Sequence, residues 1–151
     1  MKTKTIGILS AVIAIATLLI LILFYGQIPP LTPSHYGLLG IADAWEHKSL
    51  LWIIAVGNFI LNIAIGFLAR YPNIYNYPFE ITDMNRERVY AAASRFVEVL
   101  RLVTTLVFTS ITLFMSLSVE KIPILIYLCL ILSPVVCLFH GIREIHKASK
   151  K

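Results

Sequence analysis

The chain has 151 residues, of which 58% are hydrophobic and 14% are charged, and its mean hydropathy is +0.83. Soluble domains contain about 25% charged residues, and a soluble fold of this size leaves too much surface in water to cover so many apolar side chains. The two cysteines are too few for a disulfide-rich secreted scaffold, and the hydrophobic content excludes a disordered chain. The composition therefore predicts an integral membrane protein.

Four stretches of the chain lack charged residues for long enough to cross a bilayer, which needs about 20 residues of helix. We therefore expect an all-α fold, with one membrane domain over residues 1–151 formed by four transmembrane helices. The predicted spans are about 5–25, 49–69, 102–119 and 122–142. The first apolar run is longer than the 7–15 residues, roughly, of a signal-peptide core, so an uncleaved signal anchor is expected.

The basic residues predict how the bundle is oriented. If the N-terminus is cytoplasmic, only Lys48 and Lys121 of the 13 Lys and Arg residues fall outside. Cytoplasmic loops carry an excess of basic residues, so we expect both termini inside, an external loop at 26–48 and a cytoplasmic loop and helix at 70–101. The net charge of +5 does not indicate a nucleic-acid partner, because the basic residues lie at the ends of apolar runs rather than in one patch.

The third helix is expected to begin before its membrane span. Thr82 offers an N-cap hydroxyl, and Asp83 complements the helix dipole. Apolar residues then recur at helical spacing, and the charged residues assigned to the opposite face are Arg88, Arg95 and Glu98. We expect one helix over about 83–119, about 55 Å long, extended into the cytoplasm. The alternative is a separate interfacial helix with a bend near Arg95.

Small and polar residues follow one side of each later span. They are Ala55, Asn58, Asn62, Gly66 and Ala69 on helix two, Thr105, Thr109, Thr112 and Ser116 on helix three, and Cys129, Ser133, Cys137 and His140 on helix four. Such residues pack helices together in lipid, which is one interpretation. The other is a lined cavity or permeation path. The spans carry no Asp, Glu, Lys or Arg deep inside, which argues against a proton-coupled pump.

The external loop contains the residues that could bind a metal, namely His35, Asp43, Glu46 and His47. Their spacing matches no compact zinc motif, so they are weak candidates and we predict no metal or other cofactor. The sequence contains no G-x-S-x-G elbow, P-loop, G-x-G-x-x-G or H-E-x-x-H motif. We therefore expect a protein that is not an enzyme.

Two blocks of residues carry a family resemblance. The first reads Pro33-x-His35-aromatic and then Gly40-x-x-Asp43-x-Trp45-x-x-Lys48, and the second reads Asn76-x-Pro78-x-x-Ile81-Thr82-x-x-Asn85-x-x-Arg88-x-Tyr90. Together they resemble the signature of a bacterial membrane domain of unknown function, found in the N-terminal part of SdpI-type immunity proteins. Ser34 and Gly37 stand where that family usually has Thr and Asn.

The resemblance implies a multi-pass protein of the bacterial cytoplasmic membrane that gives immunity to a peptide toxin or senses the envelope. Its expected partners are the lipid bilayer and a peptide toxin or another membrane protein, and the oligomeric state stays open. The alternatives are a transporter or channel component and an external metal-binding module. The predicted topology separates the two blocks across the membrane. They could therefore serve as scaffold, with His35 bonded to Asp43, turns at Gly37 and Gly40, and an inner turn braced by Asn76, Thr82 and Asn85.

Overall fold

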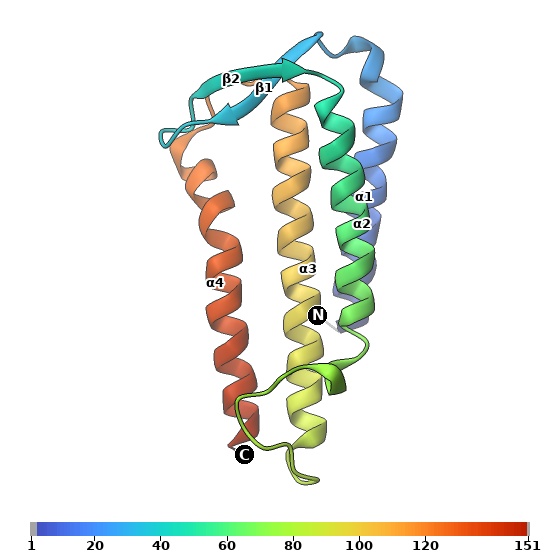
Figure 1. Cartoon of the computed structure of the whole chain (residues 1–151), viewed down its shortest axis with the longest axis vertical. Helices are drawn as coiled ribbons and strands as arrows, with labels where there is room; N and C mark the ends of the chain where they lie inside the picture. Colours follow the sequence, from blue (N-terminus) through green and yellow to red (C-terminus); the bar gives the residue numbers. More distant parts are fainter. Residues whose placement is uncertain (1–2, 151) are drawn as a thin grey trace.

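The computed structural model describes residues 3–150 and shows four long helices with a β-hairpin across one end (Figure 1). The helices are α1 (Thr3–Phe24), α2 (Leu50–Leu68), α3 (Arg86–Ser116) and α4 (Ile124–Ser149). The strands of the hairpin are β1 (Leu31–Tyr36) and β2 (Ala42–His47). There are also two short 3₁₀ helices, η1 (Tyr25–Gln27) and η2 (Pro72–Ile74). All four long helices are apolar enough and long enough to cross a membrane. This confirms the expected four helices and indicates a multi-pass membrane protein.

Helix α3 is the centre of the bundle, since it packs against each of α1, α2 and α4. Helix α4 packs on the side of α3 away from α1 and α2 (Figure 1). The hairpin covers one end, here called the hairpin end. Helix α1 begins and α4 ends at the other, here called the termini end, where α3 and α4 run on beyond α1 and α2 (Figure 1).

The long third helix is continuous, as expected, but its boundaries differ from the prediction. It begins at Arg86 rather than Asp83 and ends at Ser116 rather than Val119. Thr82 was predicted as the N-cap, and this was wrong. The backbone N–H of Thr82 donates to Oδ1 of Asn85 at 3.0 Å, so residues 82–85 form a turn before the helix instead of its first turn.

The fold was expected to be all-α, with a loop at 26–48, but this loop contains an antiparallel hairpin, so the fold is mostly rather than entirely helical. Strands β1 and β2 pair from Leu31 opposite His47 to Tyr36 opposite Ala42, with a register shift after Pro33. Thr, Tyr and Trp favour strands, and proline is tolerated in a strand at a sheet edge. A two-stranded sheet has only edges, so Pro33 does not prevent pairing.

Backbone hydrogen bonds join the hairpin to the turn between α3 and α4. The N–H of Ala42 donates to the carbonyl of Glu120, and the N–H of Ile122 donates to the carbonyl of Gly40, each at 2.8 Å. Gly40 has a φ of +71°, and a Cβ at this position would lie 2.8 Å from the carbonyl oxygen of Ile122. Only glycine satisfies both the backbone angle and the close approach.

Helix α4 contains a proline, Pro134, in its middle. Proline lacks the N–H that would bond the carbonyl four residues earlier, which here belongs to Leu130. The hydroxyl of Ser133 donates to that carbonyl at 3.5 Å. The Ser133 hydroxyl thus partly replaces the backbone hydrogen bond that Pro134 cannot make. In a membrane helix such a carbonyl needs a partner, because lipid offers none.

We predict that Gly40→Ala will loosen the hairpin from the α3–α4 turn. The left-handed backbone costs about 1–2 kcal/mol for an alanine, and the added methyl also meets the Ile122 carbonyl. Thermal unfolding in detergent should show a lower Tm, and limited proteolysis should show faster cleavage in the hairpin. Gly26→Ala is the matched control, because nothing lies within 4 Å of a Cβ at Gly26. Equal Tm values for the two variants would contradict the prediction.

Candidate functional site

The residues of the first signature block meet on the hairpin. Nδ1 of His35 lies 2.5 Å from Oδ1 of Asp43, and the two side chains remain 68% and 52% exposed. The expected hydrogen bond between them is therefore confirmed. A Cβ at Gly37 would lie 3.1 Å from Oδ2 of Asp43, so the glycine leaves room for the carboxylate. The pair fixes the tip of the hairpin while staying accessible to a ligand.

Lys48, the last residue of this block, joins the hairpin to α1. Its ammonium donates to the carbonyl oxygens of Tyr25 and Ile28 at 3.0 and 2.9 Å and lies 4.7 Å from the centre of the Tyr25 ring. A cation at the end of a helix satisfies free carbonyls and complements the helix dipole. Lys48 therefore holds the end of α1 against the start of α2 and is not free to bind a ligand.

The hairpin exposes apolar side chains. Leu38 and Leu39 at its tip are 92% and 67% exposed, and Trp45 on β2 is 47% exposed. Tyr36 lies behind them, with its hydroxyl donating to the carbonyl of Val119 at 2.9 Å. The hairpin is thus bonded to the bundle through Tyr36 and leaves the apolar side chains of Leu38, Leu39 and Trp45 exposed. We call these three residues the hairpin patch.

The four weak metal candidates do not come together. Only His35 and Asp43 are in contact, whereas Nδ1 of His47 bonds the hydroxyl of Ser49 at 3.0 Å. Within residues 3–150, no three His, Cys, Asp or Glu side chains are gathered closely enough to hold an ion. Two ligands fall short of the three or four protein ligands of typical zinc sites.

The second signature block lies at the termini end, so the two blocks occupy opposite ends of the bundle (Figure 1). Asn85 is buried and also donates to the carbonyl of Glu80 at 3.1 Å, so it braces the turn before α3. Four further signature residues of this block are exposed, namely Asn76, Pro78, Thr82 and Arg88, whereas Ile81 and Tyr90 are half-buried. This block therefore presents one structural residue and several accessible ones.

Aromatic side chains order the same loop. The ring of Tyr77 stacks on that of Tyr90, with centres 6.0 Å apart, and its hydroxyl donates to the carbonyl of Pro72 at 2.8 Å. Burial, followed by the neighbouring tyrosines Tyr75 and Tyr90, raises the pKa of Tyr77 to about 12. Tyr77 therefore remains neutral at physiological pH and acts as a packed anchor for the loop.

The most extensively bonded polar side chain inside the bundle belongs to Asn62 of α2. Its amide nitrogen donates to Ser10 Oγ of α1 at 2.6 Å and to Thr105 Oγ1 of α3 at 2.8 Å. Its carbonyl oxygen accepts from Nε and Nη2 of Arg101 at 3.1 and 2.6 Å, and Nη1 of Arg101 lies 3.2 Å from Oε2 of Glu98. One asparagine thus joins three helices and holds a largely buried ion pair.

Two glycines make room for this ion pair. A Cβ at Gly7 would lie 2.8 Å from Oε2 of Glu98, and one at Gly66 would lie 2.5 Å from Cζ of Arg101. The Glu98 and Arg101 side chains are only 13% and 12% exposed. The sequence-based assignment of Glu98 to the polar outer face was therefore wrong. The close approach of α1 and α2 at their glycines allows the pair to be enclosed.

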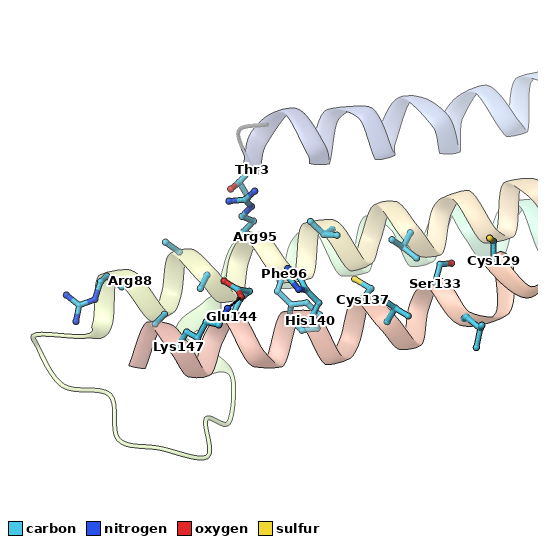
Figure 2. A pocket seen from close by; sticks show the side chains of 18 of the residues that line it. Thr3, Arg88, Arg95, Phe96, Cys129, Ser133, Cys137, His140, Glu144 and Lys147 are labelled. Carbon is cyan, nitrogen blue, oxygen red and sulfur yellow. Dashed lines mark hydrogen bonds and ion pairs between the residues drawn. The ribbon is translucent and has the colours of Figure 1, made fainter. Parts of the chain in front are cut away.

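The polar residues of α1, α2 and α3 bond to one another rather than lining an open path. Thr17 and Thr109 lie 2.9 Å apart through their hydroxyl oxygens, and Asn58 donates to Thr109 at 3.5 Å. These bonds agree with the packing interpretation for these helices. The polar stripe of α4 differs, because Cys129, Ser133, Cys137 and His140 line a groove beside α3 (Figure 2).

Comparison with known proteins gives one match. A model for a domain of unknown function, DUF1648, matches residues 12–58. The match covers most of α1, the whole hairpin and the first half of α2. No curated protein and no solved structure matches the chain.

We predict that Asn62→Ala will destabilise the bundle far more than Asn58→Ala. Both side chains are buried on α2, but Asn62 takes part in four hydrogen bonds and Asn58 in one long one. Losing Asn62 removes two bonds from a buried charged group, for a cost of about 2–3 kcal/mol. Asn58→Ala should cost less than about 1 kcal/mol. Equal losses of unfolding free energy in detergent would disprove this account of the network.

Proposed function

We propose that this chain is a non-enzymatic protein of the bacterial cytoplasmic membrane that binds a membrane-active peptide at its hairpin and thereby protects the cell. In this proposal the hairpin end is outside, both termini are inside, and the extension of α3 lies in the cytoplasm. The observation that carries it is the exposed hairpin patch, Leu38, Leu39 and Trp45, on a hairpin held rigidly over the bundle. An apolar patch on a rigid support is typical of an interaction site.

The strand next to the patch supports peptide binding. All residues of β2 after Ala42 are exposed, and within residues 3–150 the sheet consists of β1 and β2 alone. The other edge of β2 bonds the α3–α4 turn at Ala42, through the carbonyl of Glu120, and within residues 3–150 no strand pairs with it beyond that point. An extended peptide could add to this edge through backbone hydrogen bonds and place apolar side chains on the patch. The accessible His35–Asp43 pair offers polar contacts beside it.

The DUF1648 match and the first signature block both support the hairpin as the binding region. The residues matched by the DUF1648 model contain the entire hairpin, and the first signature block that resembles SdpI-type immunity proteins lies on it. Three of its residues, His35, Asp43 and Trp45, have exposed side chains, whereas Gly40 and Lys48 maintain the hairpin. Binding a peptide toxin or sensing the envelope requires accessible residues, and in this proposal the exposed residues of the hairpin fulfil that role.

The two alternatives receive less support. A transporter or channel component needs polar groups free to meet a solute, but those of α1, α2 and α3 are bonded to one another. An external metal module needs converging ligands, and only His35 and Asp43 meet.

We predict that Leu38→Asp combined with Leu39→Asp will abolish protection while leaving the bundle folded. Burying a leucine contributes about 1.5–3 kcal/mol, so losing two such contacts should weaken peptide binding at least about a hundredfold. Sensitive bacteria expressing each variant would be challenged with a panel of purified membrane-active bacterial peptides. The minimal inhibitory concentration would then be compared with binding of the labelled peptide to protein in lipid nanodiscs.

Met84→Asp is the matched control, since Met84 is 85% exposed at the opposite end of the bundle. This variant should protect as well as the wild type. If wild-type protein left killing unchanged across the panel, the proposal would be abandoned. Full protection by the double aspartate variant would place binding elsewhere on the protein.

A further inference from the structure

A large groove runs along the α3–α4 side of the bundle (Figure 2). Its volume is about 1380 Å³, its walls come from α3 and α4, and Thr3 of α1 lies at its rim. This volume exceeds the roughly 300–1,000 Å³ of pockets that bind small molecules. The groove is therefore suited to a long ligand.

Apart from Ser133 and His140, the groove is lined by apolar residues and two cysteines along residues 125–140 of α4. Its lining residues toward the hairpin end include Val99 and Val103 of α3 and Leu125, Leu132 and Val136 of α4. The α4 part, from residue 125 to residue 140, is about 22 Å long at 1.5 Å per residue. This length exceeds half of the roughly 30 Å hydrocarbon core of a bilayer. A lipid acyl chain from one leaflet fits along it.

The groove is basic at the termini end. Arg88, Arg95 and Lys147 line it there beside a single carboxylate, Glu144, which lies 2.6 Å from the Lys147 ammonium. The ion pairs among residues 3–150 include neither Arg88 nor Arg95. Arg95 extends toward Thr3 at the rim, and His140 and Lys147 lie on the α4 side (Figure 2). Because Lys147 is paired with Glu144, the excess positive charge at this end of the groove comes from Arg88 and Arg95.

We propose that this groove binds an anionic phospholipid, with an acyl chain along α3 and α4 and its headgroup at the basic end, among Arg88, Arg95 and Lys147. The two ends of the groove match the two ends of such a lipid in both polarity and charge. Arginine binds phosphate through paired N–H donors, and basic pockets between membrane helices at the end of the apolar region bind anionic headgroups. A zwitterionic lipid or a second copy of this basic chain lacks this charge complementarity.

Packing between Phe96 and Gly141 fixes the groove beside the basic end. A Cβ at Gly141 would overlap the Phe96 ring, so this glycine brings α4 close to α3. Within α4, all of which the structure describes, only Gly141 is buried. The rest of the α4 surface that faces the groove is therefore free to contact a lipid chain.

The test measures binding of phosphatidylglycerol and phosphatidylcholine to the purified full chain in detergent, by native mass spectrometry and by the rise in Tm on adding lipid. Phosphatidylglycerol should bind more tightly, with a preference that falls at high salt. Arg95→Gln with Lys147→Gln should weaken it roughly thirtyfold, because each basic group near the headgroup contributes about a factor of five. Arg70→Gln, a basic residue outside the groove, should leave the preference unchanged.

A steric variant tests the apolar part independently. Leu132→Trp fills the groove and should abolish the preference for phosphatidylglycerol, whereas Val135→Trp, at a position of similar exposure outside the groove, should not. Circular dichroism would establish that both variants retain their helices. Equal binding of the two lipids, or an unchanged preference in both groove variants, would overturn the proposal. Dimerisation blocked by Leu132→Trp, without a lipid preference, would instead identify a second copy as the occupant and also overturn it.

Discussion

The requirement that polar groups inside a membrane bundle be satisfied by the protein itself explains the arrangement of α1, α2 and α3. Asn62 uses both ends of its amide, bonding α1 and α3 through its nitrogen and Arg101 through its oxygen. Each helix therefore has a fixed rotation about its axis, since another rotation would leave a donor or acceptor without a partner. Apolar contacts alone could not specify this, because lipid chains are as apolar as the side chains they replace.

The glycines beside this network show why small residues matter as much as polar ones. Gly7 and Gly66 lie where α1 and α2 come closest to the side chains of Glu98 and Arg101. A buried ion pair is costly unless further hydrogen bonds compensate for the lost hydration. Here the Asn62 carbonyl supplies them, and the glycines allow the helices to close around the pair. The charges of α3 thereby form part of the packed interior at the termini end of the bundle.

The helices could be predicted from the sequence more completely than the connections between them. Four uncharged runs gave the positions of all four helices, because length and apolarity depend on local sequence alone. The hairpin could not be predicted in this way. Pro33 and a register shift obscure the strand pattern, and its stabilising bonds reach Glu120 and Ile122, about 80 residues away. Glu98 was misplaced for a similar reason. Its partner Arg101 lies one turn away on α3, but the glycines that enclose the pair, Gly7 and Gly66, belong to α1 and α2.

In the candidate site, too, a contact between residues close in sequence could be predicted, whereas contacts between distant segments could not. The bond between His35 and Asp43 was predicted from a short stretch of chain and is present. The bonding of Lys48 to the end of α1 was missed, although a lysine near free helix carbonyls is a recognisable signal. The groove beside α4 could be anticipated only as a stripe of polar residues, because its other wall belongs to α3.

The hydrogen bonds between the hairpin and the α3–α4 turn also order the events of biosynthesis. The hairpin is made between α1 and α2, yet its partners at Glu120 and Ile122 are made only after α3. Until then, the backbone groups of Gly40 and Ala42 must be hydrated by water. The hairpin end can therefore reach its final structure only after α3 and the α3–α4 turn have been synthesised. A completed hairpin end thus implies that α3 is already in place.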